Sequence, residues 1–160
     1  MKDNNNSDLW QSAPSATELI LRRKKLSKLD ERALTDLIAD SVRVVREKDI
    51  QGLLGLIALD FEMDAIEMIN GQKIRKVQDR DRFEIGVHGW LEGCDTSQYT
   101  VEIVSNMVNG DKGAVEVVIY DPGNPMIRDY FGGYVKETIE VGLIDGVPVI
   151  EKIKVHGNDA

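Results

Sequence analysis

The chain has 160 residues, of which 42% are hydrophobic, and this length suits one globular domain with a core of ordinary size. Its 28 acidic and 20 basic residues give a net charge of -8, which argues against nucleic acid as the main partner because phosphate binding needs a basic face. One cysteine and two histidines exclude an internal disulfide framework and argue against a metal site, so we expect no metal and no cofactor.

The N-terminal region is predicted to precede the folded domain. Residues 1–15 are polar and contain Pro14, which is typical of a disordered tail, and residues 16–28 are expected to form a short basic helical lead-in. The N-terminus lacks the pattern of a secretory signal, and no apolar run approaches the roughly 20 residues that cross a bilayer. We therefore expect a cytoplasmic protein that does not bind membranes, with a single domain at residues 29–156.

Two helices are predicted to open the domain. Asp30 is a good N-cap, and an apolar stripe follows it at helical spacing. Asp49 is placed to cap a second, shorter and leucine-rich helix. The stripe of the first helix consists of Leu34, Leu37, Ile38, Val42 and Val45.

A hairpin and a third helix are predicted next. Asn70-Gly71 separates two strand-like segments and tolerates the positive φ angles of a hairpin turn. The helix is expected from Asp79 to about Glu92, with Gly93 as its C-cap. Its apolar side holds Phe83, Val87, Trp90 and Leu91. Gly86 and Gly89 lie three residues apart on this helix, and we expect them to allow close approach of a neighbouring element.

Long strands are predicted for the rest of the chain. Segments from Tyr99 to Val108 and from Ala114 to Tyr120 flank a turn at Asn109-Gly110. After a loop, a strand is expected from Met126 to about Leu143, with a bulge at Gly132-Gly133.

Two glutamates interrupt the apolar stripe of the final hairpin. Glu137 and Glu151 lie on the apolar side of the two alternating strands, where a carboxylate is costly unless it is paired, hydrogen-bonded or part of a cavity. The turn can be a two-residue loop at Asp145-Gly146 or a three-residue loop at Ile144–Gly146. We favour the three-residue loop because it gathers the apolar residues on one face. It makes the two glutamates diagonal neighbours.

Together these elements give an α+β order of helix, helix, hairpin, helix and then four long antiparallel strands. Over residues 30–155 this order resembles the nuclear transport factor 2-like superfamily, which includes ketosteroid isomerase and the polyketide cyclases. The segments that carry the resemblance are Arg46–Leu54 before Asp60-Phe61, Tyr99–Val104 before Asn109–Lys112, and the closing Asp145–Ile150.

The resemblance implies a cone in which helices pack on the concave face of a strongly curved, mostly antiparallel sheet. The open end of such a cone often holds an apolar ligand pocket, and members commonly dimerise through the outer face of the sheet. Enzymes of the superfamily use Asp, Tyr or His in the pocket, but no catalytic motif here matches one of theirs. By position, Asp60 corresponds to a polar residue at the mouth of the pocket.

Candidate catalytic residues follow from this pattern. Glu137 and Glu151 could form an acid-base pair, because two close carboxylates in an apolar pocket push their pKa values apart. Alternatively, both are wetted or paired with Lys or Arg. His88 lies at the border of its helix stripe, where it could reach a pocket mouth or be half-exposed.

Candidate ligand-binding residues are mostly aromatic. Tyrosines on strands can bury a ring while the hydroxyl donates into a pocket, and the glycine pair is expected to curve the sheet toward the helices. The candidates are Tyr130, Phe131, Tyr134, Trp90, Tyr99 and Asp60.

Three functions remain open at this level. We favour a homodimeric domain that binds a small apolar molecule in its pocket, with no assignable reaction. The alternatives are a small isomerase, dehydratase or hydrolase that uses pocket carboxylates, and a protein-association module. The sequence leaves open whether the protein is an enzyme.

Overall fold

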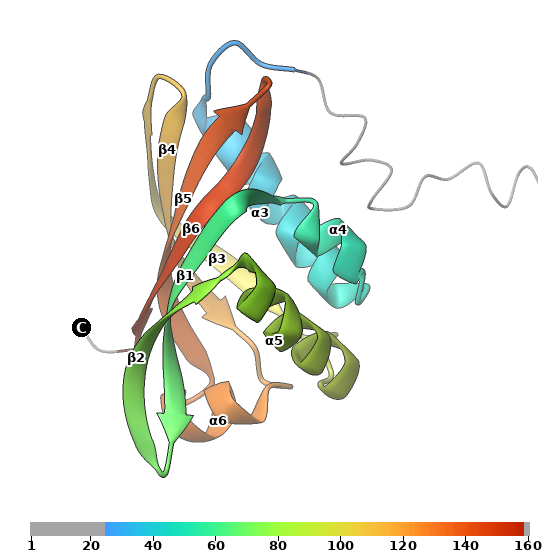
Figure 1. Ribbon diagram of the computed structural model, residues 1–160, viewed down its shortest axis with the longest axis vertical. Coiled ribbons are helices and arrows are strands. Elements are labelled where there is room, and N and C mark those ends of the chain that lie inside the picture. Colours follow the sequence, from blue (N-terminus) through green and yellow to red (C-terminus); the bar gives the residue numbers. More distant parts are fainter. Residues whose placement is uncertain (1–24, 159–160) are drawn as a thin grey trace, which may run out of the picture.

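A computed structural model describes residues 25–158 (Figure 1). The tail expected at residues 1–15 and most of the expected lead-in lie outside the described residues. The described part of that lead-in, residues 25–28, is not helical. Instead the backbone N–H of Leu26 donates to the Gly146 carbonyl at 2.7 Å, so this segment lies against the last hairpin.

The first two helices begin where the sequence predicts. Helix α3 (Glu31–Arg46) starts after Asp30, whose carboxylate accepts a hydrogen bond of 2.7 Å from the Ala33 backbone. Helix α4 (Ile50–Leu54) is capped in the same way by Asp49. The apolar stripe of α3 packs on the concave face of the sheet, and its most deeply buried members are Leu34, Leu37 and Val45. Val44, outside the predicted stripe, is also fully buried.

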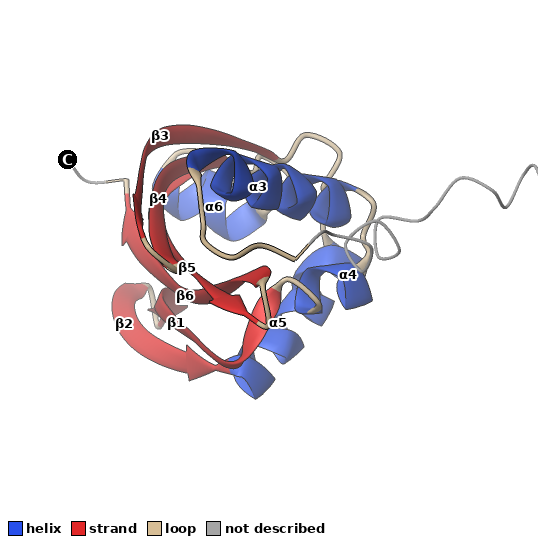
Figure 2. Ribbon diagram, turned by 90° about the horizontal axis from the view of Figure 1, so that it is seen from above, coloured by secondary structure: helices blue, strands red, loops and turns tan. Residues whose placement is uncertain are grey.

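The sheet is strongly curved and wraps round the helices, as the superfamily resemblance implies (Figures 1 and 2). Its order is β2-β1-β6-β5-β4-β3, and β1 pairs with β6 in parallel while the other pairs are antiparallel. The fold is therefore α+β and mostly antiparallel. The strands are β1 (Ile57–Ile69), β2 (Gln72–Asp79), β3 (Thr100–Asn109), β4 (Lys112–Tyr120), β5 (Tyr134–Ile144) and β6 (Val147–Gly157).

The Asn70-Gly71 hairpin and the helix that follows it are confirmed. Asn70 and Gly71 have φ angles of 50° and 79°, as a two-residue hairpin turn requires. Helix α5 (Arg80–Gly93) is capped by Asp79, and its C-cap is Cys94 instead of the expected Gly93.

The close approach expected at Gly86 and Gly89 is wrong. A Cβ added at either glycine would meet nothing within 4 Å, so no neighbouring element requires a glycine there. Both residues are exposed on α5. Both positions therefore have room for a larger side chain.

The long strand expected from Met126 is wrong in its first part. Residues Pro125–Phe131 form helix α6, and the strand begins only at Tyr134. Asn124 caps α6 by accepting a hydrogen bond of 3.1 Å from the Met126 backbone, and proline is favoured at the first helical position. Gly132 ends the helix in the left-handed region, with φ 71°, so the glycine pair is a helix C-cap and not a bulge.

The predicted register of the final hairpin is also wrong. The loop is the two-residue Asp145-Gly146, with φ angles of 52° and 78°, and Ile144 pairs with Val147. Between Glu140/Lys152 and Val141/Ile150 the register shifts, which leaves Glu151 as the extra residue of a bulge. The extra residue shifts the alternation of β6 by one position. The apolar residues on both sides of the bulge therefore face the core even though the loop has only two residues.

Candidate ligand-binding site

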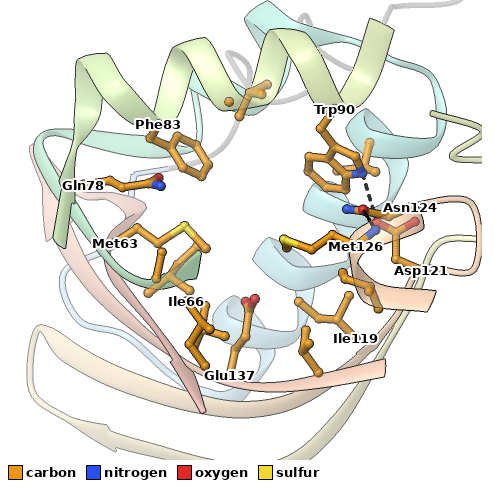
Figure 3. Close-up of a pocket in the computed structure, with 18 of the residues that line it drawn as sticks. Met63, Ile66, Gln78, Phe83, Trp90, Ile119, Asp121, Asn124, Met126 and Glu137 are labelled. Atoms are coloured by element: carbon orange, nitrogen blue, oxygen red, sulfur yellow. Dashed lines mark hydrogen bonds between the residues drawn. The ribbon is translucent and has the colours of Figure 1, made fainter. Parts of the chain in front are cut away.

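A pocket of about 470 Å³ lies between the concave face of the sheet and helices α5 and α6 (Figure 3). Most of its lining is apolar, including Phe83, Ile119, Phe131 and Ile153. The exposed residues Gly86 and Met126 also line it and mark where it reaches the surface. A pocket of this size and lining can bury a small organic molecule.

Glu137 projects into this pocket from β5. The odd-numbered residues of β5 face the concave side, so the strand carries Glu137 there between the buried Val135 and Ile139. Figure 3 shows its carboxyl group pointing into the cavity. The residue is 8% exposed, and burial alone shifts the pKa of its carboxyl group, with no hydrogen bond or charge from another residue in the range 25–158 contributing.

Burial governs the protonation of Glu137. It raises the pKa of this carboxyl group from 4.5 to about 8, because the charged form is poorly solvated in an apolar cavity. At neutral pH the group is therefore largely a neutral acid, able to donate one hydrogen bond and accept others.

Tyr99 lies near Glu137 in the same lining. Its ring contacts that of Trp90, with 5.4 Å between the centroids and 59° between the planes. Burial, followed by the negative charges of Glu137 and Asp121, raises the pKa of Tyr99 well above its ordinary value. The hydroxyl of Tyr99 thus keeps its proton.

A second carboxyl group belongs to Asp121, which directly follows β4. The indole Nε1 of Trp90 donates to its Oδ2 at 2.9 Å (Figure 3), while Oδ1 is buried without a partner of good hydrogen-bond geometry among the described residues. Burial raises the pKa of Asp121, and hydrogen bonds from Trp90 and Asn124 oppose that shift. The Trp90–Asp121 bond ties α5 to the end of the sheet.

The remaining charged side chain in the lining is Glu67 on β1. Its Oε2 accepts a hydrogen bond of 3.1 Å from Gln78, and its Oε1 lies 3.8 Å from the Arg82 guanidinium. The carboxylate of Glu67 therefore has both a hydrogen-bond donor and a nearby cation, whereas that of Glu137 has neither. Among the described residues that line the pocket there is no Lys, Arg or His.

Glu151 lies away from the pocket. A Cβ added to Gly142 would come within 2.5 Å of the Glu151 carboxyl carbon, so Glu151 lies over Gly142, on the face of β5 opposite to Glu137. Its Oε1 is 2.8 Å from the Lys112 ammonium. Because the register differs from the predicted one, the two glutamates are not diagonal neighbours.

The other sequence candidates divide between the pocket and the surface. Trp90, Tyr99 and Phe131 line the pocket. His88 is partly exposed and lies 3.6 Å from Glu92 through its Nδ1, and Asp60 is exposed on β1. Tyr130 is 49% exposed on α6, and Tyr134 packs beside Tyr120 with 6.0 Å between the ring centroids.

The part of the lining around α6 is absent from the candidate residues that the sequence suggests. The sequence predicts a loop at Asp121 and Asn124 and a strand from Met126, whereas Met126 lies in α6. The signal available was Asn124-Pro125, an N-cap followed by proline, which is typical of a helix start. Nothing in the sequence pairs Asp121 with Trp90, since they are 31 residues apart and on different elements.

Comparison with solved structures finds the same architecture in other proteins. A nuclear transport factor 2-like protein of unknown function from Silicibacter pomeroyi DSS-3 has TM-score 0.58 at 18% identity, covering 79% of this chain and 93% of that one. A similar protein of unknown function from Pseudomonas putida KT2440 has TM-score 0.57 at 15% identity, covering 78% and 84%. A protein of unknown function with a cystatin-like fold, from Nostoc punctiforme PCC 73102, has TM-score 0.54 at 12% identity, covering 82% and 93%.

The chain thus has the cone-shaped fold of the nuclear transport factor 2-like superfamily, as its sequence predicts. At these identities the likeness concerns the fold alone. No protein-family model matches the chain, and no curated protein sequence matches it. No helix within residues 25–158 is long and apolar enough to span a membrane, and those residues contain no cluster of His, Cys, Asp or Glu that could hold a metal ion.

Proposed function

We propose that this domain binds one small, largely apolar molecule inside the cone. The observation that carries the proposal is the unpartnered Glu137 carboxyl group in an otherwise mostly apolar pocket of about 470 Å³. A buried polar group without a partner is costly, and a ligand that hydrogen-bonds to it recovers part of that cost. Typical binding pockets combine an apolar lining with few polar groups that orient the ligand.

The proposal is tested by titrating the protein with Nile red, a neutral dye that fluoresces strongly in apolar surroundings. We expect saturable binding with one dye per chain. Gly86 and Gly89 provide a matched pair of variants, because both are exposed on α5 and a Cβ at either meets nothing within 4 Å, but only Gly86 lines the pocket.

A phenylalanine at residue 86 places its ring at the pocket, so Gly86→Phe should weaken Nile red binding at least fivefold, whereas Gly89→Phe should leave it within twofold of the wild type. Equal affinities of both variants, or no saturable binding by the wild type, would contradict a ligand site in this pocket.

A second candidate function is acid-base catalysis on a molecule bound in the same pocket. It is favoured by the pKa of Glu137 of about 8, which is close to neutrality, as an efficient proton donor or acceptor requires. The measurement is hydrogen–deuterium exchange next to the carbonyl of 2-acetonaphthone, followed by NMR. Catalysis by Glu137 predicts an exchange rate at least tenfold lower in Glu137→Gln, and equal rates would argue against it.

We further propose that two copies associate through the outer face of the sheet. The supporting observation is exposed apolar surface on β3, where Val104 is 64% and Met107 73% exposed. Exposed apolar side chains that cluster on one face are typical of association sites.

A further inference from the structure

The charged groups of the pocket have one sign. The titratable side chains in the lining are Glu67, Cys94, Tyr99, Asp121 and Glu137, and no described residue of the lining is basic. Glu67 is compensated by Arg82 and Gln78, and Asp121 receives a hydrogen bond from Trp90. Glu137 alone among these carboxyl groups has neither a cation nor a hydrogen-bond donor within residues 25–158.

We propose that the ligand of this pocket is a small apolar amine whose ammonium group binds the carboxylate of Glu137. This inference rests on the proposed ligand-binding function and adds the chemical class of the ligand. The amine supplies the positive charge that the surrounding elements do not provide, while its apolar body occupies the rest of the cavity.

Three ligand classes differ in what they gain at Glu137. An ammonium group donates charge-assisted hydrogen bonds to the carboxylate, and such bonds are roughly twice as strong as neutral ones. A ketone gains one neutral hydrogen bond from the protonated acid. A carboxylate ligand meets no cation in the lining, so its own charge stays unpaired in a mostly apolar cavity and it should bind most weakly of the three.

The wall opposite Glu137 also suits a cation. Phe83 and Trp90 project from α5 toward the cavity, on the side facing Glu137 (Figure 3). Aromatic faces attract an ammonium group, and indole does so best. The same rings accommodate an apolar body, so the charged end and the hydrophobic end of an amine both find complementary surroundings.

The test compares three probes that share one ring system: 1-pyrenemethylamine, 1-acetylpyrene and 1-pyrenecarboxylate. Binding is followed by fluorescence anisotropy at pH 8. We expect the amine to bind at least tenfold more tightly than the ketone, and the carboxylate to bind more weakly than both. An amine affinity equal to or below that of the ketone overturns the proposal.

Two matched variants assign the effect to one residue. Glu137→Gln should weaken the amine at least tenfold and change the ketone by less than threefold. Glu151→Gln serves as the control, because it removes a glutamate from the same hairpin but from the opposite face, where it pairs with Lys112. Unchanged amine affinity in Glu137→Gln, in a protein whose circular dichroism matches the wild type, overturns the proposal.

The pH dependence separates the two binding modes by sign. An ammonium that binds Glu137 displaces its proton, so amine affinity should rise by up to about tenfold per pH unit between pH 6 and pH 8. A ketone that accepts from the protonated acid should instead bind more weakly above pH 8. Amine affinity that falls over pH 6–8 contradicts the inference, whereas failure of Nile red and all three probes to bind contradicts the ligand-binding function itself.

Discussion

Glu137 is the residue at which the demands of folding and of the proposed ligand binding oppose each other. Its neighbours across the sheet are Val117 and Val155, both buried, so an apolar side chain would suit the core better. Retaining a carboxyl group there costs stability whenever the group ionises. A cost of this kind is typical of a site that serves a ligand.

This cost predicts how Glu137→Gln changes stability with pH. The folded protein keeps the proton up to a pKa of about 8, whereas the unfolded chain releases it near the ordinary value of 4.5. The folded state therefore binds more protons between these values, and stability falls as pH rises through this window. Relative to the variant, the wild type should lose up to about 4 kcal/mol between pH 5 and pH 8.

Urea unfolding of both proteins at several pH values measures this difference. The Glu151→Gln variant is the control, since Glu151 is partly exposed and the pKa of Glu137 does not depend on it. A difference between wild type and Glu137→Gln that stays constant from pH 5 to pH 8 would show that Glu137 is ionised throughout.

At the scale of elements, the sequence predicts those helices and turns whose start or shape depends on residues close by in the chain. The capping aspartates Asp30 and Asp49 and the Asn70-Gly71 turn each act within a few residues, and each is confirmed. The third helix also begins within one residue of the predicted Asp79, which is its N-cap. The errors arose where alternatives of similar local quality compete. Alternation alone could not reveal the bulge at Glu151, because a bulge restores the same apolar phase that the longer loop would have preserved.

In the candidate site too, features set by nearby residues are predicted from the sequence, and features set by long-range contacts are not. Alternation correctly places Glu137 on the packed face of its strand, because facing is a local property of a strand. The separation of Glu137 from Glu151 and the meeting of Trp90 with Asp121 depend on long-range register and packing. These could not be read from one sequence.

The entry to α6 is the element most sensitive to substitution at a glycine. A Cβ at Gly123 would lie 1.7 Å from the Asp95 carbonyl oxygen, and backbone cannot move aside as a flexible side chain can. Gly123→Ala should therefore displace the segment that carries Asp121 and Asn124 and destabilise the protein by about 1–3 kcal/mol.

Gly86→Ala is the matched control for this prediction. Its Cβ meets nothing within 4 Å, and alanine is favoured over glycine in an exposed helix by up to about 1 kcal/mol. Urea unfolding should give opposite signs for the two variants. A Gly123→Ala protein as stable as the wild type would mean that the α6 entry is not held against Asp95.

At the scale of the whole molecule, the proposed binding and the proposed association use opposite faces of the sheet. The concave face carries the core and the pocket, so binding inside the cone leaves the outer face available for association. The exposed apolar residues Val104 and Met107 belong to β3, which is the edge strand on one side of the sheet. Burying them against a second copy would remove apolar surface from water without closing the pocket.

Association through this face predicts a dimer in size-exclusion chromatography with light scattering. The double variant Val104→Lys/Met107→Lys should shift the protein to the monomer, because dimerisation would bring like charges together and desolvate them. Ile85→Lys is the control: Ile85 is 74% exposed but lies on α5, away from the sheet face. Since the pocket lies inside the cone, the monomeric variant should bind Nile red as the wild type does. A monomeric wild type, or a control that dissociates as readily as the double variant, would argue against this interface.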